Sequence, residues 1–213
     1  MVDLVHVDPE VVAANLARVR SEVGEGVEIL AAIKYVASSD LPALAQGGIT
    51  VVGENRAQEL LAKQAAHAAL FTWDFIGALQ SRKVKDLLGR VRCIHSVASD
   101  SVLEQLGKYG SAGTQVLIEV NVAGDASKSG IAPAELGAFI SRCPVTVAGL
   151  MTMPPFTTEA EANRGHFRTL KRLAAEHGLP QLSMGTSQDY RVAVEEGATI
   201  IRLGNTLLRG SAQ

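Results

Sequence analysis

The chain alternates, along nearly its whole length, short apolar runs typical of β-strands with segments of helical periodicity. Strand-like runs occupy residues 27–33, 49–53, 72–77, 93–97, 115–121, 145–151, 182–184 and 198–203. A helix or helical turn is expected after each. This alternation favours a parallel sheet, because parallel neighbours need a crossover connection. Eight such units in one unbroken chain predict an α/β fold with a single closed (β/α)8 barrel.

An additional helix is expected before the first strand, over residues 9–23. Asp8 can cap this helix, and Pro9 suits its first turn. Further helices are expected at 54–68, 80–88, 158–177 and 187–196, from Ser101, and from Pro133. Capping-box patterns over residues 101–104 and 158–161 indicate two of the starts. One face of the first helix is apolar by its spacing and comprises Val12, Leu16, Val19 and Val23.

The length of 213 residues lies at the lower end for such a barrel. No Pro/Gly/Ser-rich linker divides the chain, so residues 1–213 are expected to form one domain. A doubly wound sheet is the alternative fold. That fold would be expected to carry a glycine-rich phosphate loop after an early strand, and the sequence has neither GxGxxG nor GxxxxGK[ST].

The charge balance excludes several classes of partner. Twenty basic and 22 acidic residues give a net charge of −2 with no basic block, so nucleic acid is not expected as a ligand. No run of eighteen apolar residues predicts a membrane span, and residues 1–6 lack a signal-peptide pattern, so a cytoplasmic protein is expected. Cys93 and Cys143 are expected to be free thiols, and no residues have the spacing of metal ligands. The sequence shows no long exposed apolar stripe that would form a subunit interface, so a monomer is expected.

Lys34 is the most informative of the seven lysines, because it directly ends a strand-like run. An amine held in an apolar barrel mouth would be desolvated, which lowers its pKa. A neutral amine can attack an aldehyde or ketone and form a Schiff base. The alternative is a side chain that reaches solvent at the end of the strand. The other lysines lie in polar segments and are expected to be solvated: Lys63, Lys83, Lys85, Lys108, Lys128 and Lys171.

Small residues follow the seventh and eighth strands, where barrels of this kind recurrently bind phosphate. Thr186 and Ser187 follow the seventh strand, and Gly204 and Asn205 follow the eighth. Backbone N–H groups can approach an anion closely in such loops. A helix cap at Ser187 and a simple turn at Gly204 are the alternatives. Together with a Schiff-base lysine, these loops suggest a phosphorylated aldehyde, and pyridoxal phosphate fits.

Arg202 lies among apolar residues of the last strand, with its side chain on the same face as Ile200. A buried arginine needs a partner. An arginine beside the pyridine nitrogen is one arrangement that proteins use for pyridoxal phosphate. Because arginine stays protonated, it would leave that nitrogen unprotonated and weaken the cofactor as an electron sink. The alternative is an ion pair with Glu54 or Glu119.

Other polar residues at strand ends leave their roles open. Asn55 could contact a cofactor ring or help to start a helix, and Asn121 is equally open. Met151 is expected to pack at the barrel mouth. His95 and His166 show no partner in the sequence and are expected to be structural or surface residues.

The chain resembles the pyridoxal-phosphate homeostasis proteins, also called the YggS or proline-synthetase co-transcribed family. These are similar to the barrel domain of alanine racemase standing alone. The matching segments occur in order and span nearly the whole chain. They are residues 30–34 (LAAIK), 52–55 with 58–59 (VGEN, QE), 73–85 (WDFIGALQSRKVK), 94–97 (IHSV), 119–121 (EVN), 127–130 (SKSG), 149–154 (GLMTMP), 182–187 (LSMGTS) and 195–204 (EEGATIIRLG).

The resemblance implies that Lys34 forms the internal aldimine with pyridoxal phosphate and that Asn55 lies near the ring. It implies that Arg202 sits by the pyridine nitrogen. It also implies a role in vitamin B6 and amino-acid homeostasis as a carrier or regulator with little or no catalysis, with apo pyridoxal-phosphate enzymes as possible recipients. The residues that the resemblance assigns to the phosphate, largely through backbone N–H groups, are Thr186, Ser187, Gly204 and Asn205.

Some positions depart from the family pattern. Histidine is usual where Asp74 and Ala78 stand, which puts a side-chain role there in doubt. Methionine is common at Thr186 and a small residue at Asn205, and Leu208-Arg209-Gly210 replaces a more usual Phe-Gly. The backbone N–H of Asn205 remains a donor, so phosphate binding is little affected.

Two enzymatic alternatives remain open at this point. The first is a slow pyridoxal-phosphate-dependent racemase. A racemase of the related fold takes its second base, a tyrosine, from an additional C-terminal domain, and Tyr35 is expected to point to the other side of the strand from Lys34. No catalytic residue is therefore assigned. The second alternative is a cofactor-free Schiff-base aldolase that uses Lys34 on a sugar phosphate.

Overall fold

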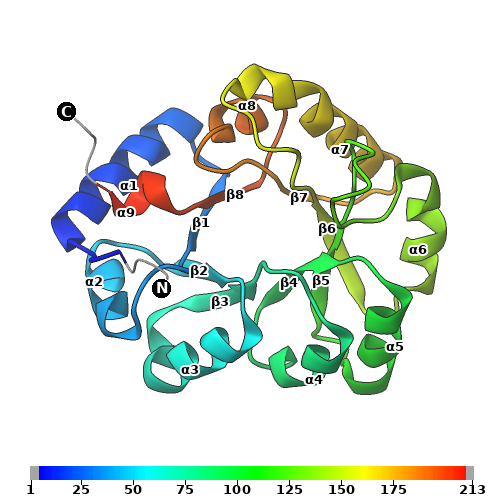
Figure 1. Cartoon of the computed structure of the whole chain (residues 1–213), viewed down its shortest axis with the longest axis horizontal. Coiled ribbons are helices and arrows are strands. Elements are labelled where there is room, and N and C mark those ends of the chain that lie inside the picture. The colour runs from blue at the N-terminus through cyan, green and yellow to red at the C-terminus, as the bar shows by residue number, and fades with distance from the viewer. Residues whose placement is uncertain (1–4, 210–213) are drawn as a thin grey trace.

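The computed structural model describes residues 5–209 and shows a closed barrel of eight parallel strands inside a ring of helices (Figure 1). The strands follow one another around the barrel in chain order, and β8 closes it by pairing with β1. The predicted (β/α)8 barrel is therefore confirmed. The strands are β1 Glu28–Ala32, β2 Val51–Glu54, β3 Thr72–Phe75, β4 Cys93–Val97, β5 Gln115–Glu119, β6 Thr146–Met151, β7 Gln181–Ser183 and β8 Ile200–Leu203.

The helices form the outer ring of the barrel (Figure 1). They are α1 Pro9–Val23, α2 Leu41–Gln46, α3 Ala57–His67, α4 Val84–Leu87, α5 Asp100–Tyr109, α6 Leu136–Arg142, α7 Arg164–Glu176, α8 Tyr190–Glu195 and α9 Asn205–Leu208. Short 3₁₀ turns lie at Ser38–Asp40, Ala68–Leu70, Ser81–Lys83, Pro133–Glu135 and Ala160–Asn163. No helix within residues 5–209 is both long and apolar enough to cross a membrane.

The additional helix α1 forms as its sequence predicts. The Asp8 carboxylate accepts the N–H of Glu10 at 2.9 Å and caps the helix. The helix packs against α2, α8 and α9, so it covers the point where the last strand meets the first. Its predicted apolar face is buried and comprises Val12, Leu16, Val19 and Val23.

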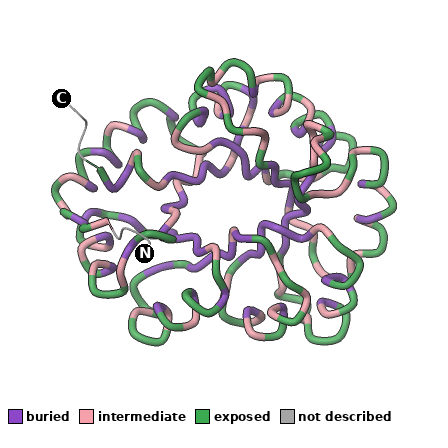
Figure 2. Tube along the Cα trace, in the orientation of Figure 1, coloured by how far each residue is buried: buried purple, intermediate pink, exposed green. Residues whose placement is uncertain are grey.

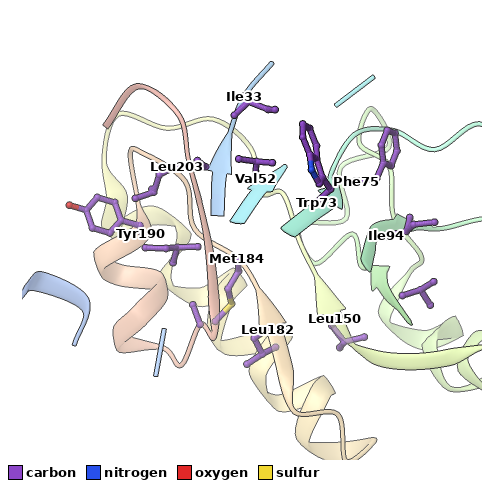
Figure 3. Close-up of a cluster of buried hydrophobic side chains, with 14 of the residues drawn as sticks. Ile33, Val52, Trp73, Phe75, Ile94, Leu150, Leu182, Met184, Tyr190 and Leu203 are labelled. Carbon is purple, nitrogen blue, oxygen red and sulfur yellow. The ribbon is translucent and has the colours of Figure 1, made fainter. Parts of the chain in front are cut away.

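The core consists of two layers separated by the strands, which are the most buried part of the trace (Figure 2). Successive strand residues point alternately inward and outward. The larger layer fills the space between barrel and helices, and Figure 3 shows its residues Val52, Ile94, Leu150 and Leu203. Burying each such side chain contributes about 1.5–3 kcal/mol. The layer inside the barrel comprises Leu30, Val51, Cys93, Leu117, Met151 and Ile200.

Several expected helix starts are wrong. Helix α5 begins at Asp100, ahead of the Ser101 pattern, and α7 begins only at Arg164. The Thr157 hydroxyl instead accepts the N–H of Glu159 in a local turn. Helix α8 begins at Tyr190, so Ser187 does not cap it. These patterns fail because a Ser/Thr followed by Glu three residues later also fits a turn or the inside of a first helical turn.

Candidate functional site

A pocket of about 460 Å³ opens at the carboxyl ends of the strands, where a barrel of this class places its site. Every strand contributes to it, either by its last residues or by the loop that follows. Its lining therefore brings together segments far apart in the sequence. The lining residues are Ala32, Lys34, Tyr35, Asn55, Ile76, Gly77, Ala78, Ser96, Glu119, Lys128, Ser129, Met151, Met153, Phe156, Thr186, Ser187, Gln188, Arg202, Gly204, Asn205 and Leu208.

All seven residues that the sequence assigned to a cofactor line this one pocket. Six of them follow the ends of β1, β2, β7 and β8, and Arg202 lies within β8. Met151 lies in the wall and is buried, as expected of a packing residue at the barrel mouth. Asn121 does not line the pocket, and its amide instead donates to the carbonyl oxygens of Asp125 and Lys128.

Lys34 is exposed at the pocket, so the expected desolvation of its amine is wrong. Its Nζ lies 4.5 Å from the centroid of the Tyr35 ring. The expectation that Tyr35 points away from Lys34 is also wrong, because strand β1 ends at Ala32 and strand alternation no longer governs residues 34 and 35. The amine is thus accessible to a ligand and is stabilised by the aromatic face beside it.

The loops after β7 and β8 present backbone donors to the pocket. Within residues 5–209, no protein acceptor takes the backbone N–H of Ser187, Gly204 or Asn205. The N–H of Thr206 donates to the Ser187 hydroxyl at 3.4 Å, which joins the two loops. Free N–H groups from two adjoining loops suit an anion such as a phosphate.

Asp189 fixes the shape of the β7 loop. Its carboxylate accepts the N–H of Thr186 at 2.7 Å and the amide of Asn163 at 2.8 Å. Thr186 therefore lines the pocket with its own N–H already bonded. Gly185 has a φ of +90°, which favours glycine. An added Cβ there would lie 2.6 Å from the Cβ of Ala193.

Arg202 is buried at the base of the pocket. Its guanidinium donates to the Ser183 hydroxyl at 2.6 Å and to the Thr152 carbonyl oxygen at 3.0 Å. Burial lowers the pKa of Arg202 to about 10, so it remains protonated at neutral pH. The alternative ion pair with Glu54 or Glu119 is not formed. Ile200 shares the inward face, as predicted.

Glu54 has a different partner, which overturns the expectation that Lys63 is solvated. Lys63 is 4% exposed, and its Nζ contacts the Glu54 carboxylate at 2.6 Å and the Ile33 carbonyl oxygen at 2.8 Å. The same carboxylate accepts the N–H of Asn55 at 2.6 Å. This pair therefore holds the backbone next to Lys34 and at Asn55, beneath two predicted cofactor residues.

His95 also has partners that were not visible in the sequence. Its Nε2 lies 3.1 Å from the Asp74 carboxylate and its Nδ1 lies 3.0 Å from the Ser183 hydroxyl. Burial would raise the pKa of Asp74, but hydrogen bonds from His95 and Arg92 outweigh that effect and hold it below its usual value. Burial lowers the pKa of His95. The pair is thus an ionised carboxylate beside a neutral imidazole.

Comparison with known proteins places this architecture in a family. Residues 7–211 match the model of the alanine racemase N-terminal domain. A pyridoxal phosphate homeostasis protein of Aquifex aeolicus is 42% identical over 86% of both chains, and one of Pseudomonas aeruginosa is 34% identical over 92% of this chain and 94% of its own. The chain belongs to the family of pyridoxal phosphate homeostasis proteins.

Solved structures agree with this membership. PipY of Synechococcus elongatus, solved with PLP bound, has a TM-score of 0.82 at 33% identity, covering 93% of this chain and 100% of PipY. Alanine racemase of Corynebacterium glutamicum has a TM-score of 0.73 at 16% identity, covering 96% of this chain and 61% of its own. The second likeness concerns the fold alone.

Several lining residues were missed in the sequence. Burial raises the pKa of Glu119, although its carboxylate accepts the Ser129 hydroxyl at 2.5 Å. Met153 and Phe156 are exposed at the rim, 51% and 73%. Lys128 also lines the pocket, although its polar loop predicts a solvated residue.

Proposed function

We propose that this protein binds pyridoxal 5′-phosphate at the pocket, covalently through Lys34, and acts in vitamin B6 and amino-acid homeostasis as a carrier or regulator. One observation carries the proposal: a single pocket unites an accessible amine, two loops with free backbone N–H groups and a buried arginine. The aldehyde, the phosphate and the pyridine nitrogen of this cofactor match those three groups in kind.

The relatives support the same ligand. The curated relatives at 42% and 34% identity are both named pyridoxal phosphate homeostasis proteins, and PipY was solved with PLP bound. A cofactor-free aldolase finds no such support. The proposal therefore does not extend to sugar-phosphate cleavage.

Each residue has a part in this proposal. Lys34 supplies the amine that attaches to the aldehyde carbon with loss of water, and the aromatic face of Tyr35 holds that amine near the pocket. Arg202 donates to the ring nitrogen, and Asn55 lies near the ring. When bound, the cofactor supplies an electron-accepting ring, which a protonated arginine at the nitrogen keeps weak.

The phosphate is assigned to the two loops after β7 and β8. The free N–H groups of Ser187, Gly204 and Asn205 donate to its oxygens, and the Ser187 hydroxyl remains able to donate as well. Thr186 belongs to the site through the shape of its loop, because its N–H is held by Asp189.

We propose that turnover is weak or absent. General acid–base catalysis of racemisation needs a second group across the bound cofactor from the lysine. Tyr35 adjoins the Lys34 amine and does not face it from the opposite wall. A slow racemase is the alternative activity, and it is tested by a broad panel of D- and L-amino acids with Lys34→Ala as control.

The cellular setting is proposed on the same basis. We propose a cytoplasmic monomer that passes the cofactor to apo pyridoxal-phosphate enzymes. The rim of the pocket supports contact with a recipient, because Tyr35, Met153 and Phe156 expose apolar surface there. Isolation of a stable dimer that buries this rim would contradict that part of the proposal.

Absorption titration with pyridoxal phosphate tests the function. Wild type is expected to bind one equivalent and to develop the visible band of a Schiff base, because Lys34 brings an exposed amine into the pocket with the phosphate loops. Lys34→Ala is expected to lose the band. Lys171→Ala, an exposed lysine on α7, is the matched control and is expected to retain it. A band of equal strength in Lys34→Ala would refute the assignment.

A further inference from the structure

Four polar side chains form a continuous chain through the inside of the barrel. Asp74 from β3, His95 from β4, Ser183 from β7 and Arg202 from β8 are 0%, 0%, 0% and 6% exposed. They link in that order by contacts of 3.1, 3.0 and 2.6 Å. Buried polar groups are costly unless each is hydrogen-bonded, so this chain is a specified feature of the barrel interior.

The charges at the two ends fix the direction of every hydrogen bond. Arg202 can only donate, so Ser183 Oγ accepts from it and must donate its own hydrogen elsewhere. The acceptor is His95 Nδ1, 3.0 Å away. His95 then carries its proton on Nε2 and donates it to the Asp74 carboxylate. Ionised Asp74 and protonated Arg202 thus select one tautomer of His95.

Asp74, at the end of this hydrogen-bonded series that lies away from Arg202, is itself anchored. Arg92 Nε donates to its carboxylate at 3.0 Å, and the Arg92 guanidinium also binds Glu28 at 2.6 Å. Asp74 therefore keeps its charge and its position although it is fully buried.

Two of the five N–H groups of Arg202 have no protein acceptor among residues 5–209, one on Nη1 and the one on Nε. Its two terminal nitrogens are bonded, Nη1 to Ser183 and Nη2 to Thr152 and Met153. Nε has no protein acceptor among residues 5–209, and Arg202 lines the pocket. We propose that Asp74, His95 and Ser183 are positioning residues that hold Arg202 with Nε–H directed at the pyridine nitrogen of the bound ligand. The ligand in this inference rests on the proposed function.

The first test needs no cofactor. Nitrogen-15 NMR of the ligand-free protein is expected to show His95 with Nε2 protonated and Nδ1 unprotonated, and a single sharp Arg202 Nε–H signal. Ser183→Ala is expected to shift the Nδ1 signal and to broaden the arginine signal, because the hydroxyl between the two groups is gone. Thr199→Val is the matched control, since it removes a hydroxyl that also joins β7 and β8, at Leu182. It is expected to leave both signals unchanged.

The second test measures the ring contact. Pyridoxine 5′-phosphate lacks the aldehyde, so its affinity reports the phosphate and ring without Lys34. Ser183→Ala is expected to lower the affinity for this ligand about tenfold. It is expected to leave unchanged the affinity for a carbocyclic analogue that has carbon in place of the ring nitrogen. A loss of protein stability alone would lower the affinity for both ligands equally. Asp74→Asn, which keeps the shape and removes the charge, is expected to act in the same direction.

The outcomes separate the two proposals. Protonated Nδ1 in wild type, unchanged NMR signals in Ser183→Ala, or equal loss for both ligands would overturn the positioning role. If wild type binds neither ligand, the proposed function fails, and with it the target of Nε–H. The NMR signals would still decide whether Asp74, His95 and Ser183 orient Arg202.

Discussion

At the scale of single residues, the site depends on buried ion pairs as much as on the groups that face the ligand. The Lys63–Glu54 pair lies under the ends of β1 and β2 and bonds the backbone at Ile33 and Asn55. Removing one partner of such a pair leaves the other as an unpaired buried charge. The pair therefore supports both the fold and the placement of Lys34.

Lys63→Met is expected to lower the free energy of unfolding by about 3–5 kcal/mol, because it leaves the Glu54 carboxylate without a cation. The double variant Lys63→Met/Glu54→Gln is expected to recover part of that loss, since no buried charge remains. Denaturant unfolding measures both, with Lys171→Met as the exposed control, expected to change stability by less than about 0.5 kcal/mol. Equal stability of Lys63→Met and the control would show that the pair contributes nothing.

The residues facing the pocket were easier to predict than those behind it. Lys34, Ser187 and Arg202 stand at the ends of strand patterns, and strand ends meet at one face of a barrel. Lys63 looked solvated because its helix is rich in polar residues, although it lies three positions after buried Leu60 and so shares its inner face. The partner of His95 comes from another strand, and only the barrel register brings Asp74 to it.

At the scale of elements, the loop after β7 shows how local backbone geometry shapes the site. Gly185 takes a positive φ directly before Thr186 and Ser187, and the Cα of Tyr190 would lie 3.0 Å from an added Cβ. No other residue type fits there without moving helix α8. The loop can therefore keep its N–H groups at the pocket without help from a ligand.

Two glycine substitutions test this geometry against each other. Gly185→Ala is expected to destabilise the protein by about 1–3 kcal/mol and to weaken phosphate binding, because the loop must shift. Gly165→Ala, inside helix α7 with open space around it, is expected to stabilise by about 0.5–1 kcal/mol. Thermal unfolding and binding of inorganic phosphate measure the pair. A stable Gly185→Ala variant with unchanged phosphate affinity would contradict the account of the loop.

Element types were predictable and their bounds were not. Eight apolar runs of strand length gave the barrel, because their number and alternation with helices leave few topologies. Helix α2, over Leu41–Gln46, is too short to show a periodic pattern. Asp8 capped α1 as expected, whereas the Ser101 and Thr158 patterns did not mark helix starts, because tertiary packing decides among several local hydrogen bonds.

At the scale of the whole molecule, the barrel is closed by contacts between the start and the end of the chain. Helix α1 packs on α8 and α9, and Glu22 at its end binds Arg191 at 2.9 Å, together with Tyr190 and Arg18. Hydrogen bonds from Arg191, Tyr190 and Arg18 outweigh burial and lower the pKa of Glu22 to about 2. This carboxylate thus joins segments 169 positions apart.

This junction makes stability depend on pH. Because the pKa of Glu22 is lower in the folded than in the unfolded chain, its contribution is full above about pH 4.5 and is lost as pH falls toward 2. Arg191 is largely exposed, so Glu22→Gln is expected to cost only about 1 kcal/mol at pH 7. Denaturant unfolding should show this difference at pH 7 and a smaller one at pH 3. A difference that grows on acidification would contradict the assignment.

The most direct measurement of the central claim is borohydride reduction of the protein loaded with pyridoxal phosphate, followed by peptide mass mapping. Reduction fixes the ligand on the nitrogen that holds it, and seven lysines compete for it. The adduct is expected on the peptide that contains Lys34, with loss of the visible band. No uptake of pyridoxal phosphate, or an adduct on a lysine outside the pocket such as Lys83, would contradict the account.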